Sequence, residues 1–435
     1  MRILLLAYYF PPDGGPGAQR PISFARHLPA YGVQCTVLTR SPPPARGKFD
    51  PADAAVEAEL AATTRIVRTP PTAVSLLDLG RAMVETGRAL CAAERPDVVL
   101  ATMSPFGLWQ PAAQIAAEHG LPVVFDLRDP WALDGVQDHR SPWHLYRERQ
   151  AMRRMLRAAD GVVANTKEAR LAMLRFAPEL APERIVAITN GWDAAEFAPP
   201  APRVEPGPKL TLLHAGSFLC EELYAHERPL RRWLGWLRRR AEPIDPSGRT
   251  PLHLLAALRR LRSQGAAAGH EVRFANIGMI DAALERCVRE SGVADAVDLV
   301  PYQPHARLLA ELRSADALFL TLHGLPPGHR SRIVPGKTYE YLASGRPILA
   351  GLPEGDAREL VGTSPRAFLA DPCQAEALAT QIVALHAQWR RGDLATAAAP
   401  PGLGFYERGH LTGQLAEFLS HVIRNLGRTH DPRKA

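Results

Sequence analysis

The strongest constraint on the fold is a regular alternation of short apolar runs with helix-length amphipathic segments. The chain opens with an apolar run at Ile3–Tyr8, a Pro/Gly loop at Phe10–Gly17, a helical pattern at Arg20–Tyr31 and a second apolar run at Gln34–Thr39. This order is that of a βαβ unit. Repetition of the pattern predicts an α/β protein with mostly parallel sheets, covered by helices on both faces.

The same pattern continues in two halves of similar size. A chain of 435 residues is long for one core, so two domains of about 200 residues are expected. Further strands are predicted at 97–101, 122–126, 161–164 and 185–189, and then at 210–214, 272–277, 297–300, 317–322 and 347–350.

A proline-rich segment at 199–208 separates the halves and reads as a stiff linker. The predicted organisation is an N-terminal Rossmann-like domain, the linker, a C-terminal Rossmann-like domain with a basic insertion at about 219–249, and a tail. We expect the tail's helix, about Leu411–Leu426, to pack on either domain, including back on the first. The ranges are 1–198, 199–208, 209–400 and 401–435.

The composition indicates where the protein is located and which kinds of partner it binds. The chain is 46% apolar and 22% charged, contains no run of 18 apolar residues and shows no signal-peptide cleavage pattern, so a cytoplasmic location is expected. The five cysteines lack any CxxC spacing, which argues against a disulfide framework or a zinc knuckle. The net charge of +7 favours an anionic partner, although an Arg-rich composition explains the excess equally well.

One stretch breaks the alternation, at Glu227–Arg240. On a helix, Leu230, Trp233, Leu234 and Leu237 share one face, and the Arg side chains occupy the remainder. Such a helix either lies peripherally on an anionic bilayer, at the inner face of the cell membrane, or folds its apolar face onto its own domain. The sequence leaves both open.

The segment Pro335–Leu349 carries the features of a nucleotide site. A helix that begins at Pro335-Gly336 presents free N–H groups and its positive end to a diphosphate. Lys337 supplies a cation there, and Glu340, one turn into the helix, is placed to accept hydrogen bonds from ribose hydroxyls. The alternative is a buried helix whose single Glu faces water.

Two further motifs follow predicted strands in the first half. Gly14 and Gly15 permit the close backbone approach that a phosphate-cradling turn requires, but the loop lacks the G-x-G-x-x-G of a nicotinamide dehydrogenase. Asp126, Arg128 and Asp129 crowd the end of another strand, where two carboxylates and a guanidinium suit a sugar hydroxyl or a developing charge. The alternative is that Asp129 caps a helix that begins at Pro130.

Taken in order, these motifs resemble the family 4 glycosyltransferases of the GT-B fold, in their bacterial polysaccharide and lipopolysaccharide branch. The resemblance spans Ile3 to about Ala350 and rests on motifs that occur in the family's order. These are Tyr9-Phe10-Pro11-Pro12 with Gly14-Gly15 and Arg20, Asp126-Leu127-Arg128-Asp129-Pro130-Trp131, Ala164-Asn165-Thr166, Asn190-Gly191-Trp192-Asp193, His214-Ala215-Gly216-Ser217, and Lys337-Thr338-Tyr339-Glu340-Tyr341 with Gly345-Arg346-Pro347.

The resemblance implies two Rossmann-like domains whose sheets face a central cleft. It implies a hexosyl-type glycosyltransferase that moves a sugar from a nucleotide-sugar donor to a glycan or lipid-linked acceptor, with retention of configuration. Neither a metal ion nor a separate cofactor is implied, and nucleic acid is not a partner. The implied catalytic residues are Asp129, Arg128 and Asp126, and the implied donor-binding residues are Glu340, Lys337, Arg249, Gly216, Ser217, Gly14, Gly15, Arg20, Gly336, Thr338 and Arg332.

Several positions depart from the family's pattern. Arg332 stands eight residues before Glu340, where relatives often carry a second Glu. No His stands near the end of the strand that runs into Asp126, and the insertion after Phe218 displaces Arg249 along the chain. These departures leave open a nucleotide-sugar-binding subunit that has lost catalysis. A sugar-nucleotide epimerase of the GT-B fold is another alternative.

Overall fold

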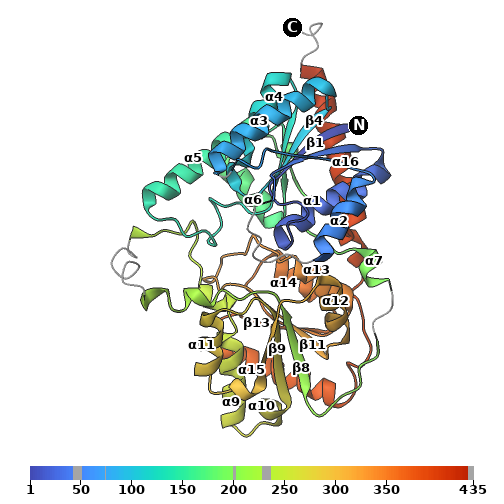
Figure 1. Cartoon of the computed structure of the whole chain (residues 1–435). Coiled ribbons are helices and arrows are strands. Elements are labelled where there is room, and N and C mark those ends of the chain that lie inside the picture. The colour runs from blue at the N-terminus through green and yellow to red at the C-terminus, as the bar shows by residue number, and fades with distance from the viewer. Residues whose placement is uncertain (43–50, 74, 199–201, 228–236, 430–435) are drawn as a thin grey trace. The chain divides into compact units, whose positions relative to one another are not determined.

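The computed structural model describes residues 1–42, 51–73, 75–198, 202–227 and 237–429 (Figure 1). The chain forms two compact α/β units. Unit 1 contains Met1–Leu133, Tyr146–Gly191 and the chain from Phe405 onward, and unit 2 contains Asp134–Leu145 and Trp192–Gly404. The prediction of an α/β protein with two parallel sheets is confirmed.

Unit 1 is built on a seven-stranded sheet in the order β3-β2-β1-β4-β5-β6-β7. Every adjacent pair is parallel, so helices must cross between successive strands. The strands are β1 (Arg2–Ala7), β2 (Gln34–Thr39), β3 (Arg65–Arg68), β4 (Val98–Met103), β5 (Val123–Leu127), β6 (Gly161–Ala164) and β7 (Ile185–Ala187).

Helices bury both faces of this sheet, because side chains of opposite parity along each strand are apolar. On β1, Leu4 and Leu6 belong to the core under α3 (Leu76–Ala93), α4 (Trp109–His119), α5 (Pro142–Ala158) and α6 (Lys167–Phe176). Ile3 and Leu5 belong to the opposite core, with residues of α1 (Pro16–His27), α2 (Pro51–Ala61) and α16 (Arg408–Thr429). Helix α16 thus packs on unit 1, beside α1.

Unit 2 repeats the plan with a six-stranded parallel sheet, in the order β10-β9-β8-β11-β12-β13. Its strands are β8 (Leu210–Ala215), β9 (Val272–Gly278), β10 (Val297–Pro301), β11 (Ala317–Thr321), β12 (Ile348–Gly351) and β13 (Ala367–Ala370). Its helices are α7 (Ala194–Phe197), α9 (Leu252–Ser263), α10 (Ala267–Glu271), α11 (Ala282–Glu290), α12 (His305–Ser314), α13 (Lys337–Ser344), α14 (Asp356–Gly362) and α15 (Ala375–Arg390).

Every predicted strand is present, but two strands of the structure escaped prediction. These are β3 and β13, of four residues each, which lie at the edges of the two sheets. An edge strand buries less of its surface than a central one, and Arg65–Arg68 has an Arg at each end. Such a segment therefore lacks the continuous apolar run by which the central strands are recognised.

The described part of the proline-rich segment belongs to unit 2. The N–H of Val204 donates to the carbonyl of Ala395 at 2.8 Å, and the guanidinium of Arg346 donates to the carbonyl of Pro202. Residues 202–208 are therefore held along the surface of that unit by hydrogen bonds.

Most of the basic stretch predicted at 227–240 lies outside the described residues, so the bilayer interpretation stays a prediction. Its described end is bound within unit 2 by the segment Asp134–Leu145. Arg238 pairs with Asp138, Arg239 forms a two-bond backbone bridge with His139, and Arg240 donates to the carbonyls of Gly135 and Val136. These arginines therefore stabilise a loop that follows β5 in sequence.

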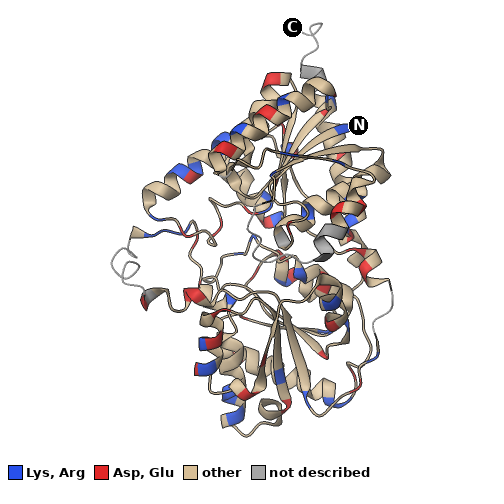
Figure 2. Cartoon of the chain, in the orientation of Figure 1, with Lys and Arg blue, Asp and Glu red and all other residues tan. Residues whose placement is uncertain are grey.

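Charge is distributed over both units. Figure 2 shows Lys and Arg interspersed with Asp and Glu along the helices of each unit. Within the described residues no helix has both the length and the hydropathy needed to cross a membrane.

Candidate functional site

The centre of the site in unit 2 is a contact between a lysine and a buried histidine. Lys337, the first residue of α13, places its Nζ 3.1 Å from Nε2 of His214, near the end of β8. The other ring nitrogen, Nδ1, lies 2.8 Å from the carbonyl oxygen of Phe319. Since a carbonyl only accepts, Nδ1 carries the proton and Nε2 accepts from the ammonium.

The electrostatic environment favours a neutral His214 beside the ammonium of Lys337. Burial, together with the charge of Lys337, holds the pKa of His214 well below its usual range, so the ring is neutral at physiological pH. Burial and the nearby charge of Arg249 lower the pKa of Lys337 to about 8, although the carboxylate of Glu340 opposes the shift. The ammonium bonded to His214 keeps two other N–H groups, which are suited to an anionic ligand such as a diphosphate.

Two glycines create the space for this arrangement. Gly216, just after β8, has φ +122°, and a Cβ there would lie 2.7 Å from Nζ of Lys337. Gly278, at the end of β9, packs so closely that a Cβ would lie 2.3 Å from the carbonyl oxygen of Gly216. The ends of β8 and β9 therefore both require glycine. The exposed Ser217 directly follows Gly216. The neighbouring N–H of Ala215 donates to Tyr341 Oη at 2.8 Å.

The other predicted donor residues of unit 2 surround this centre. Glu340 is buried in the first turn of α13, and Gly336 is the residue before the helix, with helical dihedral angles. Arg249 ends a 3₁₀ turn, η7 (Pro246–Arg249), near enough to lower the pKa values of Lys337 and His323. The structure thus brings Gly216, Lys337, Glu340 and Arg249 together.

Near this centre, three buried polar side chains have atoms without hydrogen-bond partners among the described residues. They are both polar atoms of Asn276, Nδ1 of His323 and the hydroxyl of Thr338. Asn276 is the register partner of His214 on the neighbouring strand, and Thr338 follows Lys337. Buried polar groups in folded proteins almost always have partners, so these side chains indicate that a ligand or water completes the site.

Sequence reasoning assigned no role to the side chains of His214, Asn276 and His323. His214 lies in a quoted motif, two residues before Gly216, but nothing in the sequence shows that its ring meets Lys337, 123 residues later. Asn276 and His323 carry one usable signal, because each is a polar residue near the carboxyl end of an apolar strand.

Arg332 is paired with a carboxylate from another part of unit 2. Its guanidinium lies 2.8 Å from Glu242, near the end of the basic insertion, and both side chains are largely buried. Arg332 thus occupies the position where relatives often carry a Glu, and the carboxylate of Glu242 lies next to it. The insertion supplies that carboxylate.

Unit 1 joins two of its predicted site residues in one buried ion pair. Arg20 of α1 binds the carboxylate of Asp126 through Nε and Nη2, at 2.7 to 2.9 Å, and also donates to the carbonyls of Ile188 and Thr189. The hydroxyl of Thr102 donates to the same carboxylate. Asp126 is completely buried, so this network ties α1, β4, β5 and the end of β7 together.

The remaining predicted residues of unit 1 lie around this pair. Arg128 is half-buried, donates to the carbonyl of Gly17 at 3.3 Å, and has a pKa lowered by burial, against the opposing charge of Asp129. The alternative that Asp129 caps a helix at Pro130 is wrong, since the chain continues in turns and α5 begins only at Pro142. Gly14 and Gly15 are exposed immediately before α1. The catalytic roles stay predictions.

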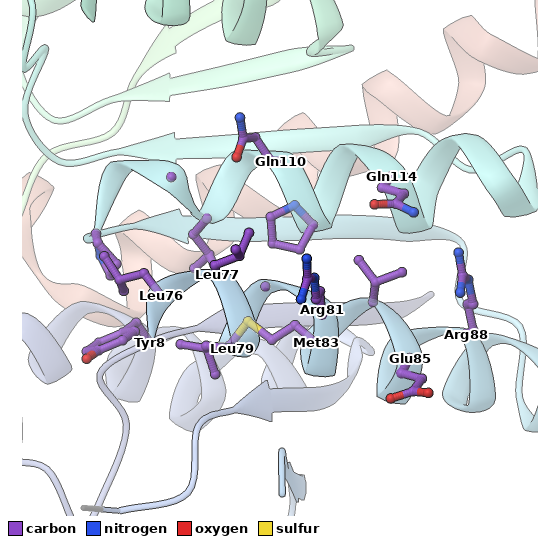
Figure 3. Close-up of a pocket in the computed structure, with 16 residues that line it drawn as sticks. Tyr8, Leu76, Leu77, Leu79, Arg81, Met83, Glu85, Arg88, Gln110 and Gln114 are labelled. Carbon is purple, nitrogen blue, oxygen red and sulfur yellow. The ribbon is translucent and has the colours of Figure 1, made fainter. Parts of the chain in front are cut away.

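Unit 1 also contains an apolar groove of about 690 Å³ between α3 and α4. Figure 3 shows Leu76 and Tyr8 at one end and Arg88 and Gln114 at the other. Tyr8 directly follows β1, so one end of the groove lies at the carboxyl edge of the sheet, where α/β proteins bind ligands. Leu76 and Leu77 are 63% and 66% exposed, an unusual position for large apolar side chains at the start of a helix.

Two family models match the chain in succession. The model described as Glycosyltransferase Family 4 matches residues 19–196, and the one described as Glycosyl transferases group 1 matches residues 249–388. The first match covers most of unit 1 and the second begins at Arg249 and contains Lys337 and Glu340. A comparison with curated proteins found no match.

Solved structures of the same fold cover almost the whole chain. Anabaena Alr3699/HepE in complex with UDP and glucose is 17% identical, with a TM-score of 0.61 over 97% of this chain and 100% of that one. The lipopolysaccharide outer core galactosyltransferase WaaB is 12% identical, with a TM-score of 0.57 over 97% and 99%. A UDP-GlcNAc 2-epimerase from Methanocaldococcus jannaschii is 11% identical, with a TM-score of 0.53 over 97% and 100%.

Proposed function

Because the chain is a glycosyltransferase of the GT-B fold, with a family 4 domain followed by a group 1 domain, we propose that it transfers a sugar, with retention of configuration, from a nucleotide-sugar donor to a lipid-linked or glycan acceptor. The donor binds unit 2, the acceptor binds unit 1, and the reaction serves cell-surface polysaccharide synthesis. No metal ion takes part in the transfer. The protein works in the cytoplasm, at the inner face of the cell membrane where it uses a lipid-linked acceptor.

The Lys337–His214 contact carries this proposal. Departure of a nucleoside diphosphate concentrates negative charge on the phosphate oxygens, and a metal-free site needs fixed cations and N–H donors there. Lys337 is such a cation, oriented by a neutral imidazole beside a glycine turn. Arg249 adds a second positive charge, and Glu340 is a carboxylate suited to ribose hydroxyls. HepE, of the same fold, is described with UDP and glucose bound.

The decisive experiment combines a panel of nucleotide sugars with lipid-linked and free glycan acceptors in the presence of EDTA. We expect release of free nucleotide from one donor, a glycosylated product of retained configuration, and no requirement for a divalent ion. Glu340→Ala is expected to weaken binding of that donor by about 10- to 100-fold, because a hydrogen bond to a charged group contributes about 1.5–3 kcal/mol. Activity that depends strictly on a divalent ion contradicts the proposal.

The same assay separates two alternatives. An epimerase, such as the UDP-GlcNAc 2-epimerase of the same fold, changes the donor's sugar without an acceptor, and nuclear magnetic resonance of the product detects this. A subunit without catalysis binds the donor and turns over no acceptor. The replacement of the family's Glu by Arg332, paired with Glu242, is the observation that keeps this second alternative in the test.

We place the apolar part of a lipid-linked acceptor in the α3–α4 groove. The groove begins at the carboxyl edge of the sheet and runs between two packed helices. Its exposed leucines offer apolar surface that a hydrocarbon chain would cover. The ion pair between Arg88 and Glu118 lies at the far end.

The double variant Leu76→Ser/Leu77→Ser is expected to raise KM for a long-chain lipid-linked acceptor by about 10- to 100-fold, from the loss of about 1.5–3 kcal/mol of apolar burial. KM for the nucleotide sugar and activity on a short-chain, water-soluble acceptor should stay unchanged. Leu171→Ser, at an exposed leucine of α6 outside the groove, serves as the matched control. Equal losses on both acceptors would count against the groove.

A further inference from the structure

Three side chains of unit 2 with metal-binding atoms meet outside the donor site. They are Asp245, just before η7, His253 in the first turn of α9, and Cys373, shortly after β13. One carboxylate oxygen, one imidazole nitrogen and the thiol sulfur all lie within 4.8 Å of one another. Side-chain adjustments of about 1 Å bring such atoms to the roughly 3.3–3.8 Å separations of tetrahedral zinc ligands.

The local hydrogen bonds hold these atoms close together. Oδ1 of Asp245 accepts from the N–H of Ser247 at 2.9 Å, and the carboxylate also has side-chain hydrogen bonds with Ser247 and Cys373. Nε2 of His253 lies 2.8 Å from the hydroxyl of Ser247, which also lies 3.8 Å from Sγ of Cys373. The N–H of Cys373 donates to Oδ1 of Asp371 at 2.9 Å, and this fixes the loop that carries the thiol.

The three donor types also suit a cation. A neutral imidazole nitrogen is a common metal ligand. A bound divalent ion supplies the positive charge that makes the thiolate of a coordinating cysteine favourable.

A pocket of about 330 Å³ adjoins the cluster and provides room for a further ligand. Asp245, Asp371 and Cys373 line it, together with Gly324 and Pro326. Three protein ligands beside an open pocket are typical of zinc sites that keep one coordination position for water or another small ligand. The mixture of carboxylate, imidazole and thiolate fits Zn²⁺ better than Mg²⁺ or Ca²⁺, which take oxygen ligands.

The cluster is mechanically joined to Arg249 through η7. Asp245 precedes this turn, Arg249 ends it, and Gly248 between them packs so that a Cβ would lie 3.1 Å from Sγ of Cys373. The carbonyl of Gly248 accepts from the hydroxyl of Thr321 at 2.6 Å. The position of Arg249 therefore depends on a turn whose other end contacts the cluster.

We propose that Asp245, His253 and Cys373 bind one Zn²⁺ ion, which holds η7 and thereby the position of Arg249. The second half of this statement rests on the proposed role of Arg249 in donor binding; the first half does not. On binding, the thiol of Cys373 loses its proton to solvent and its sulfur forms a bond to the metal. The ion holds the turn through its three protein ligands and takes no part in sugar transfer.

The first test uses the full chain, freed of metal by a chelator, and titrates it with Co²⁺ as a spectroscopic substitute. We expect one equivalent of Co²⁺ to produce a thiolate-to-cobalt charge-transfer band, and Zn²⁺ to displace it. Cys373→Ser and His253→Ala should each abolish the band. Two matched controls, Cys91→Ala in unit 1 and His270→Ala at an exposed histidine of unit 2, should retain it. No band in the wild-type protein, or one that persists in Cys373→Ser, overturns the site.

The second test uses only the wild-type protein, so its result does not depend on how well a variant folds. Calorimetry of Zn²⁺ binding in buffers of different ionisation enthalpy should show release of about one proton per ion, because the thiol is the group that must deprotonate. Zn²⁺ should also raise Tm of the wild-type protein, since a ligand that binds only the folded state stabilises it. Binding without proton release would exclude Cys373 as a ligand.

The link to Arg249 is tested by the affinity for the nucleotide found in the donor panel. Zn²⁺ is expected to tighten nucleotide binding to the wild-type protein and to have no effect on Cys373→Ser. If the cobalt band appears and nucleotide affinity does not change, the metal site stands and its link to Arg249 is wrong. If no nucleotide binds at all, the proposed function fails while the spectrum still decides the metal site.

Discussion

Replacing Lys337 with Met is expected to lower kcat/KM for the nucleotide sugar by about 100- to 1,000-fold, the usual effect of removing one fixed donor from a site of developing negative charge. The variant keeps the length of the side chain and removes the ammonium that His214 orients. Steady-state kinetics with the identified donor measure the change. Lys209→Met, at an exposed lysine of the same unit, is the control and should retain full activity.

The pH dependence of the wild-type enzyme should report the same group. Burial lowers the pKa of Lys337 to about 8, so the ammonium is present below that pH and is lost as the pH rises through it. We therefore expect kcat/KM for the donor to fall above about pH 8, and the corresponding step to be absent from Lys337→Met. A step that survives in the variant would assign the titration to another residue.

Asp126→Asn is expected to lower the free energy of unfolding by about 3–5 kcal/mol, the usual cost of leaving one member of a buried ion pair without its partner. The guanidinium of Arg20 stays buried, with carbonyl partners but without its counter-charge. Urea-induced unfolding measures the change. Arg26→Ala, on the same helix, removes an exposed ion pair with Glu59 and should change stability by less than about 1 kcal/mol.

This experiment also decides between two roles for Asp126. The motif predicts a catalytic residue, whereas its complete burial against Arg20 and Thr102 favours positioning. If it positions α1 and the loop before it, stability and activity fall together in Asp126→Asn. A variant of wild-type stability with no activity would restore the catalytic interpretation.

The fold was predictable where buried elements appear as apolar runs in the sequence. Central strands such as β1, β4 and β5 are buried on both faces, and they appear as largely apolar runs. The edge strand β3 has an Arg at each end, and the edge strand β13 is apolar but only four residues long. The candidate site was predictable where a motif is local, as in the run from Gly336 to Glu340, whose residues share one helix start.

The sequence by itself determined the fold class, the family and the positions of Gly216, Lys337 and Glu340, because apolar periodicity and short motifs are properties of neighbouring residues. Only the tertiary structure decided which side chains meet. It paired Arg20 with Asp126, Lys337 with His214 and Arg332 with Glu242, and it gathered Asp245, His253 and Cys373. Contacts across such sequence separations depend on the register of strands and the packing of helices, which no single segment encodes.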